Sequence, residues 1–335
     1  MKTRKTNRLA VTVAGALAAG LSLASTPAAA AEIRIAVGCP PVKACGDWVY
    51  GDDLAKQLTA NGLPAKVFHS GALGKDPEVI DQLSQGLLQF GLTNFVMVKQ
   101  VDPTVVGFIA PYMFDSNEHM FRAMAETDIV KGVDANLQKQ GLKLAAFIGV
   151  GGAVGIFNTK HPVKTVADTR DLRLRGIDRS QIELFKTWGA KGVVVDMTEV
   201  TTSLQKGLIH GYINPPIVPI IFKQLSLMKH YTNAEIAYGF RSALMSNDWY
   251  KKLSADDRKK VDEAVAYATK RNRAWTAAAA KQEVALMKKN GVQIVNLTPE
   301  ARAAFVEASK KSWPAMIPKD KIQMFVDAAA KTRKK

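Results

Sequence analysis

Cysteine and histidine are scarce in this chain of 335 residues, and familiar catalytic motifs are missing. Two cysteines cannot form a disulfide-scaffolded small protein or a four-cysteine zinc or iron–sulfur site. The five histidines stand far apart, none with a metal-ligand partner nearby in the sequence. P-loop, G-x-S-x-G and H-E-x-x-H motifs are absent as well. Residues distant in the sequence could still assemble a catalytic site, but no local pattern indicates an enzyme or a cofactor.

Long hydrophobic runs are also lacking. The uncharged run at residues 9–24 is half Ala or Gly, whereas spanning a bilayer takes roughly 20 strongly apolar residues. Four basic residues precede this run, and Pro27 with small residues to Ala31 follows it. These three parts are typical of a secretory signal cleaved near Ala31, so we assign residues 1–31 to a signal peptide and expect a periplasmic protein. An uncleaved anchor and a lipid-modified N-terminus are less favoured alternatives.

Charge of one sign dominates, because 46 basic residues face 30 acidic ones and give a formal charge of +16. Removal of the four basic residues of the signal leaves +12. Basic and aromatic residues do not form the interleaved stripe that single-stranded nucleic acids require. We therefore expect a solvated basic surface and no nucleic-acid partner. A mild positive field would also raise the arrival rate of anionic solutes.

The two cysteines, Cys39 and Cys45, are separated by five residues that include two prolines. Export would place them in an oxidising compartment, which favours a disulfide over two free thiols. The spacing differs from the C-x-x-C of a redox motif.

Apolar patterning predicts strands and helices that alternate in two successive blocks. The first block has predicted strands at 32–37, 65–68, 90–93 and 142–148 and helices at 47–58, 76–88 and 117–140. The second has strands at 155–158, 172–174, 193–195 and 211–214 and helices at 181–188 and 199–207. Such alternation predicts an α/β protein with mostly parallel sheets in two lobes.

A long helix follows the second block. Ser254 and Asp257 resemble a capping box, and no proline interrupts the chain before Gly291. A helix of about 36 residues would be about 54 Å long, so we expect it to run along both lobes. We predict lobe I to contain residues 32–152 and about 240–279, and lobe II to contain residues 153–239 and about 280–335.

The glycine-rich segment at residues 149–155 follows a predicted strand but does not match G-x-G-x-x-G, because Val154 occupies the place of the third glycine. An extended segment follows instead of a helix, which leaves no helix N-terminus for a pyrophosphate. We interpret the glycines as a crossing between lobes at which side chains would obstruct.

Candidate ligand-binding residues stand where short apolar strands end. Asn94, Arg175 and Asn214 occupy such positions, and ligands of open parallel sheets collect beyond the carboxyl ends of strands. The guanidinium of Arg175 could bind a carboxylate bidentately. Strand alternation places Arg173 on the same face, so the strand alone does not choose between the two arginines. A surface or interlobe ion pair is the alternative role.

Several spaced motifs resemble those of the solute-binding proteins of tripartite ATP-independent periplasmic (TRAP) transporters, over nearly the whole mature chain. They are V-F-H-S-G-A-L-G at 67–74, F-I-A-P-Y-M-F at 108–114, G-L-K-L at 141–144, D-L-R-L-R at 171–175, T-E-V at 198–200, L-Q-K-G at 204–207 and G-Y-I-N-P-P at 211–216.

The resemblance implies a two-lobed periplasmic-binding-protein fold that closes on a small organic acid and delivers it to TRAP membrane subunits. It assigns the carboxylate grip to Arg175 and a cleft position to Asn214. Trp48 and Asn94 match cleft residues of the family less closely, and for Trp48 a core role is equally favoured. Tyr212 and Arg179 complete the predicted site. We expect a monomer.

Three departures from the family bear on the ligand. Gly155 stands where many members have a second arginine, Gly176-Ile177 replaces R-V-P, and the Cys39–Cys45 turn is unusual. Arg179 either supplies the missing charge or is an exposed helix start, which we favour. One charge clamp instead of two would suit a small monocarboxylate, a sulfonate or an aromatic acid. An exported enzyme and a ligand-sensing module on the same scaffold remain the alternative functions.

Overall fold

The computed structural model describes residues 32–334, so the predicted signal peptide lies outside the described part of the chain. The strands are β1 (Ile33–Val37), β2 (Ala65–Phe68), β3 (Phe90–Asn94), β4 (Leu142–Ala153), β5 (Gly155–Asn158), β6 (Arg173–Gly176), β7 (Lys191–Val194), β8 (Gly211–Asn214), β9 (His230–Asn233), β10 (Tyr238–Ser246) and β11 (Gln293–Asn296). The α-helices are α1 (Gly46–Ala60), α2 (Asp76–Ser84), α3 (Phe95–Val101), α4 (Asn117–Glu126), α5 (Ile129–Gln138), α6 (Arg179–Thr187), α7 (Val200–Gln205), α8 (Ile217–Ile221), α9 (Asn247–Lys252), α10 (Ala255–Lys289), α11 (Pro299–Lys310), α12 (Trp313–Met316) and α13 (Lys319–Thr332). A 3₁₀ helix, η1, spans Pro103–Ile109.

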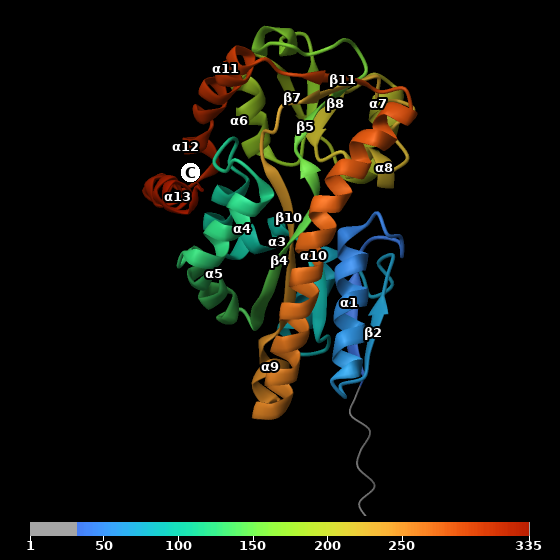
Figure 1. Ribbon diagram of the computed structural model, residues 1–335, viewed down its shortest axis with the longest axis vertical. Coiled ribbons are helices and arrows are strands. Elements are labelled where there is room, and N and C mark those ends of the chain that lie inside the picture. Colours follow the sequence, from blue (N-terminus) through green and yellow to red (C-terminus); the bar gives the residue numbers. More distant parts are fainter. Residues whose placement is uncertain (1–31, 335) are drawn as a thin grey trace, which may run out of the picture. The chain divides into compact units, whose positions relative to one another are not determined.

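The strands form two sheets, one in each lobe (Figure 1). Lobe I contains the order β2-β1-β3-β10-β4, and lobe II contains β11-β9-β5-β8-β6-β7. The sequence predicted mostly parallel sheets, but both are mixed. β10 pairs antiparallel with β3 and β4, and β5 pairs antiparallel with β8 and β9. The reason is that the chain passes directly from one lobe to the other between β4 and β5 and again between β9 and β10, without the crossover helix that a parallel pair requires.

The connection between the lobes is packed tightly against α10. A Cβ added to Gly149 would lie 2.5 Å from Thr276 Oγ1, and one added to Gly151 would lie 2.3 Å from Glu283 Oε1. Gly151 also has a φ of +132°, a backbone conformation that residues other than glycine rarely adopt. The glycine-rich segment is therefore a close-packed crossing, as the sequence indicated.

Helix α10 spans both lobes, as predicted (Figure 1). Its 35 residues extend about 52 Å. Ser254 Oγ accepts a hydrogen bond from Asp257 N at 3.0 Å, and Gly291 follows the last turn with a φ of +75°. Ala264 and Ala268 pack in the core of lobe I, whereas Met287 packs in the core of lobe II. One helix thus contributes to two hydrophobic cores.

The C-terminal helices pack on elements of both lobes. Phe305 of α11 packs in lobe II against Trp188, with ring centroids 5.4 Å apart. Helix α13 packs instead on α4 and η1 of lobe I. Its Phe325 enters the lobe I core beside Phe108, where Gly107 leaves room for the ring. The apolar face of α13 is buried there.

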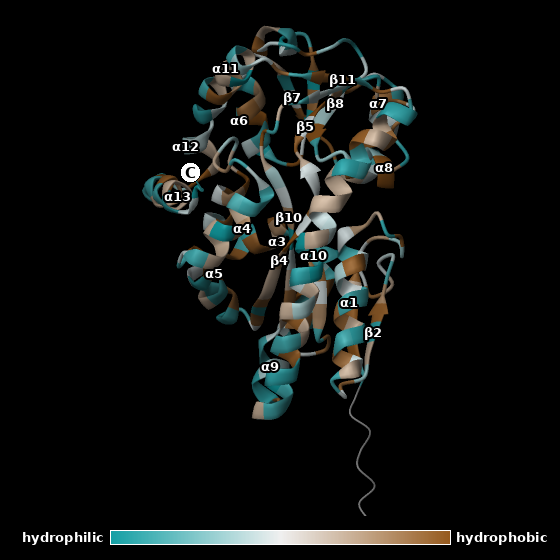
Figure 2. Cartoon of the chain, in the orientation of Figure 1, coloured by the Kyte–Doolittle hydropathy of each residue, from teal (hydrophilic) through white to brown (hydrophobic). Residues whose placement is uncertain are grey.

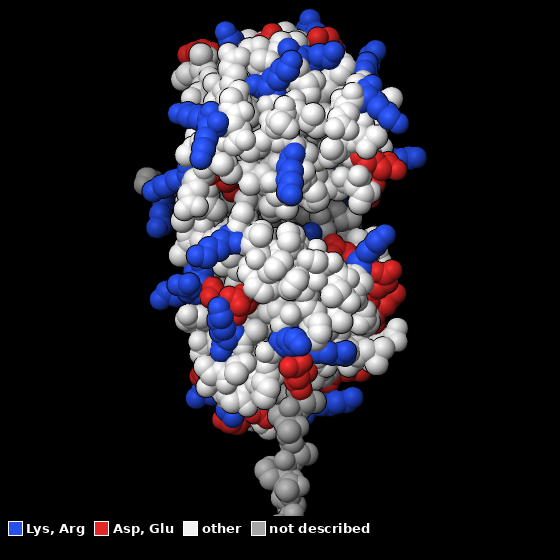
Figure 3. Space-filling model, turned by 90° about the vertical axis from the view of Figure 1, so that its right-hand side faces the viewer, with Lys and Arg blue, Asp and Glu red and all other residues white. Residues whose placement is uncertain are grey.

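Hydrophobic residues gather on the strands and on short helices near the crossing, such as the brown helix α8 in Figure 2. Lys and Arg are spread over the face shown in Figure 3, with Asp and Glu in smaller groups among them. This distribution agrees with a solvated basic surface. Within residues 32–334, no helix is both long and apolar enough to cross a membrane.

Candidate functional site

A cleft of about 510 Å³ is lined by residues of both lobes. Lobe II contributes the ends of β6 and β8, and lobe I contributes the ends of β1, β3 and β10 and the start of α1. Strand ends meet here because the two sheets face each other across the crossing segments. Among the predicted site residues, the structure brings Arg175, Asn214 and Asn94 together in this cleft.

Arg175 lies on β6 between β7 and β8 and is only 6% exposed. Its Nε donates to Val195 O at 2.8 Å. Within residues 32–334 no carboxylate forms an ion pair with it, and no protein hydrogen bond uses its Nη atoms. Burial lowers the pKa of Arg175 below its ordinary value, opposed by the nearby Asp196. The protein thus holds a desolvated cation with a single backbone partner at the cleft wall.

The structure separates Arg175 from Arg173, which the strand pattern could not do. Arg173 Nε donates to Leu208 O at 3.0 Å, and its Nη2 donates to Gly207 O. Arg173 is therefore bound to the loop after α7 and does not line the cleft.

Asn214 ends β8 immediately before Pro215 and lines the cleft. Its Nδ2 is buried and has no hydrogen-bond partner among the described residues. Asn214 pairs in the sheet with Gly155, the position where the motif alignment lacks a second arginine. A Cβ at Gly155 would lie 2.3 Å from the Tyr231 ring and 2.5 Å from Thr232 O. The packing of lobe II leaves no room for a side chain at this position and therefore excludes an arginine here.

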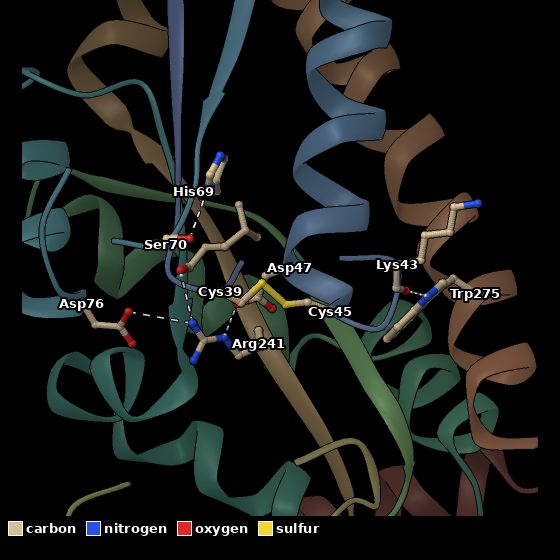
Figure 4. The surroundings of a disulfide bond; sticks show 10 residues. Cys39, Lys43, Cys45, Asp47, His69, Ser70, Asp76, Arg241 and Trp275 are labelled. Atoms are coloured by element: carbon tan, nitrogen blue, oxygen red, sulfur yellow. Dashed lines mark hydrogen bonds and ion pairs between the residues drawn. A yellow bond between two sulfur atoms is a disulfide. The ribbon is translucent and has the colours of Figure 1, made fainter. Parts of the chain in front are cut away.

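Lobe I contributes an arginine that sequence reasoning missed, Arg241 on β10. Its Nε donates to Asp47 Oδ2 at 2.8 Å, and its Nη2 lies 3.8 Å from Asp76 Oδ1 (Figure 4). Nη2 also donates to Leu92 O at 3.3 Å. Burial raises the pKa of the Asp47 carboxyl, with Arg241 opposing. The strand 238–246 was not recognised in the sequence, so no signal placed this arginine at the cleft.

Asn94 lines the cleft beside this cluster, opposite Arg241 in the β3–β10 register. Its Oδ1 accepts from Val96 N at 3.0 Å and caps α3, while its backbone N donates to Asp76 Oδ2 at 2.8 Å. The Asn94 side chain is therefore partly committed to the start of α3.

Trp48, Tyr212 and Arg179 do not line the cleft. Trp48 packs against the lobe I core with its ring edge-on to His69, 5.6 Å between centroids. Tyr212 is fully buried, and its hydroxyl donates to Gln224 Oε1 at 2.7 Å. Arg179 is exposed at the first residue of α6.

The rest of the cleft wall is mainly apolar. Its apolar members include Phe95, Ile109, Pro111, Val150, Val154, Ile177, Leu184, Met197, Ile213, Ile217, Val218, Ile221, Phe222, Ile236, Phe240 and Met316. The polar side chains that can face a ligand are few by comparison, and they come from Asp47, Asn94, Arg175, Gln181, Asn214 and Arg241.

Cys39 and Cys45 are joined by a disulfide, as predicted, and both line the cleft. The bond closes the turn between β1 and α1, one residue from Gly46 and two from Asp47 (Figure 4). Trp275 of α10 ties down the same turn, because its Nε1 donates to Lys43 O at 2.9 Å. The disulfide thereby fixes the start of α1, whose first turn places Asp47 beside Arg241.

An ion pair connects the lobes at the edge of the cleft. Lys99 Nζ on α3 of lobe I lies 2.6 Å from Oδ2 of Asp178, and Oδ1 of the same side chain caps α6 of lobe II. Partial burial raises the pKa of Asp178, but hydrogen bonds from Lys99 and Ser180 outweigh it and lower the pKa below its ordinary value.

Residues 50–320 match the family described as "Bacterial extracellular solute-binding protein, family 7". The chain belongs to this family. The matched family is the DctP family of TRAP periplasmic solute-binding proteins, as the motifs indicated. Its members bind solutes and are not enzymes, which removes the exported-enzyme alternative. Within residues 32–334, no group of three or more His, Cys, Asp or Glu is placed to hold a metal ion.

Relatives match along most of their length. The chain is 28% identical over 300 residues to the ectoine/5-hydroxyectoine-binding periplasmic protein UehA of Ruegeria pomeroyi, covering 87% of each. It is 26% identical over 313 residues to the C4-dicarboxylate-binding periplasmic protein DctP of Rhodobacter capsulatus, covering 90% of this chain and 91% of that one. A TRAP periplasmic solute-binding protein from Bradyrhizobium, solved in complex with galacturonate, superposes with a TM-score of 0.79 at 24% identity, covering 90% and 99% of the two chains. The superposition confirms the two-lobed fold.

Proposed function

We propose that this protein binds a small organic anion between its lobes in the periplasm and delivers it to the membrane subunits of a TRAP transporter. The observation that carries the proposal is the buried guanidinium of Arg175, which faces the cleft without a carboxylate partner among residues 32–334. Export by the signal at residues 1–31 would bring the chain to that compartment, and the periplasmic relatives support it.

The site chemistry follows from two side chains of lobe II, Arg175 and Asn214, whose cleft-facing donors have no protein partner among residues 32–334. The Nη atoms of Arg175 would donate to a carboxylate, and Asn214 Nδ2 would donate a directional hydrogen bond to the same ligand. A buried donor without a partner, such as Asn214 Nδ2, costs roughly 1–3 kcal/mol. A bound anion would remove that cost and neutralise the desolvated cation.

Ligand contacts to both lobes would stabilise the closed arrangement. Contact from Arg175 on one side and from lobe I on the other couples binding to closure, since a ligand shifts a two-state equilibrium by its differential affinity for the two states. The Lys99–Asp178 pair joins the lobes in this structure and would add to the same state.

Calorimetry with a panel of carboxylates tests the site, after native mass spectrometry of freshly purified protein for a co-purified small molecule. Arg175→Ala should weaken binding by about 2–5 kcal/mol, the effect of truncating a buried charge pair. Arg173→Ala is the matched control and should change affinity less than threefold, because Arg173 binds backbone carbonyls outside the cleft. Equal affinity of the Arg175 variant and the wild type would refute the site.

Uptake by reconstituted membrane subunits tests delivery. The ligand-loaded protein should drive accumulation of the ligand in vesicles that contain the subunits, and the Arg175→Ala protein should not. Ligand binding without any uptake, combined with binding to a signalling receptor, would favour the ligand-sensing module instead.

A further inference from the structure

We infer that the cleft selects a monocarboxylate with an apolar body and disfavours dicarboxylates and polyhydroxylated sugar acids. This inference rests on the proposed function and narrows its ligand class. Two independent features of the cleft support it: the charge of the cluster on the lobe I side and the chemistry of the wall.

The lobe I side carries a charge cluster, formed by Asp47, Asp76 and Arg241, that is net negative. Two carboxylates surround one guanidinium, and Arg241 is already engaged by Asp47 at 2.8 Å, by Asp76 at 3.8 Å and by Leu92 O at 3.3 Å. Asp47 is buried at 6% exposure, and the side chains of Arg241 and Asp76 are partly buried. Screening by salt is weak at buried sites. A second carboxylate of a ligand held on Arg175 would therefore meet an occupied arginine and the like charge of Asp47, while Asp76 engages Arg241 from outside the cleft wall.

This arrangement discriminates by repulsion as well as by attraction. A site rejects a competitor when it presents unpaired or like charges to it. Lobe II cannot offset the effect, because Gly155 has no room for the side chain of a second cation. The cleft thus contains two arginines but offers a ligand the guanidinium of Arg175.

The wall provides few acceptors for ligand hydroxyl groups. The side-chain oxygen of Asn94 already accepts from Val96 N, and that of Gln181 accepts from Ile177 N at 2.9 Å. The Tyr238 hydroxyl is turned away and donates to Asp115 O. Burial of a hydroxyl without a partner is unfavourable, whereas an aliphatic or aromatic body would bury apolar surface against α8 and the strand ends.

The first test is a titration of the exported wild-type protein with four probes: 4-methylpentanoate, 3-phenylpropanoate, succinate and galacturonate. The better of the two apolar monocarboxylates should bind at least tenfold more tightly than succinate and galacturonate. Tighter binding of succinate or galacturonate would overturn the inference, and the proposed function would survive if that binding depended on Arg175. A failure of every probe to bind would overturn the inference. The proposed function would be refuted only if Arg175→Ala also left the binding of a co-purified ligand unchanged.

The second test releases Arg241 from the cluster. Asp47→Asn removes one carboxylate and should shift the succinate-to-monocarboxylate affinity ratio at least tenfold toward succinate. Asp53→Asn is the matched control, because Asp53 lies on the same helix and pairs with Arg271 outside the cleft. Its ratio should stay within threefold of wild type. An unchanged ratio in a folded Asp47→Asn protein would contradict the charge argument, and the wild-type titration decides the inference if that variant does not fold.

Discussion

Arg175 and Arg241 line the same cleft from opposite lobes, with different partners. Arg175 on β6 has a backbone carbonyl for its Nε and no carboxylate within ion-pair distance in the described chain. Arg241 on β10 has Asp47, Asp76 and a backbone carbonyl. The comparison teaches that lining a cleft does not make an arginine available to a ligand, because the surrounding acids decide whether its charge is already used.

Removing each guanidinium tests this comparison most strongly. Arg241→Met should lower the free energy of unfolding by about 3–5 kcal/mol, because it leaves Asp47 buried without its partner. Arg175→Met should change it by about 1 kcal/mol or less, because the loss of one hydrogen bond to a backbone carbonyl is offset by the removal of a desolvated charge. Urea unfolding of the ligand-free proteins measures both. Similar losses in the two variants would break the distinction between the arginines.

Glu283 extends the comparison to buried acids. It lies on α10, is 3% exposed, and has Gly152 N at 3.0 Å as its hydrogen-bond partner, with no basic side chain in ion-pair contact in the described chain. Burial raises the pKa of Glu283 from 4.5 to about 7, opposed by the Gly152 hydrogen bond. The folded state therefore binds a proton more tightly than the unfolded state does.

Glu283 should therefore stabilise the folded state most below about pH 4.5. As the pH rises toward about 7, up to about 3 kcal/mol of this stabilisation should be lost. Glu283→Gln should remove this pH dependence from the free energy of unfolding, measured between about pH 5 and about pH 8. Glu263→Gln, an exposed residue of the same helix, is the control and should leave the slope in place. A slope that persists in Glu283→Gln would disprove the assignment.

The disulfide bears on the Arg241 side of the comparison, because it fixes the turn that precedes Asp47. Replacing Cys39 and Cys45 with Ser should lower the free energy of unfolding by about 2 kcal/mol, the loop-closure value for a bridge between residues six apart. Thermal or urea unfolding with and without a reductant checks this. The reductant should destabilise the wild type and leave the double variant unchanged, and an insensitive wild type would contradict the prediction.

The smallest expected effect concerns the pair that joins the lobes. Lys99→Met should weaken ligand binding by about 0.5–1 kcal/mol, the range of a partly exposed ion pair, mainly through faster release. Stopped-flow dissociation at low salt measures this. Lys56→Met removes an equal charge from an exposed pair within α1 and should not change release. Equal release rates for Lys99→Met and the wild type would exclude a role of the pair in closure.

Local patterns in the sequence predicted many elements well. The strands 65–68, 155–158 and 211–214 have the predicted bounds, and the long helix begins and ends as its cap and glycine indicated. The predicted helix 117–140 is instead two helices, because Thr127 is extended between α4 and α5. Neither proline nor glycine marks this break, so the apolar pattern continues through it.

The candidate site was harder to predict than the elements. Arg175 and Asn214 could be chosen because each ends a short strand within a recognised motif. Arg241 could not, since its strand was not recognised and its partner Asp47 is 194 residues away in the chain. Tyr212 belongs to a lobe II core because the alternation of β8 turns it inward, and Trp48 of α1 packs half-buried against the lobe I core, so neither residue lines the cleft.

The sequence by itself determined the family, the alternation of strands and helices, the long bridging helix and the arginine at the end of β6, because these depend on local periodicity, caps and motifs. The tertiary structure decided which arginine is neutralised, which glycine excludes a side chain, and where the last helix packs. Those properties depend on distances between groups far apart along the chain, and no local pattern encodes such distances.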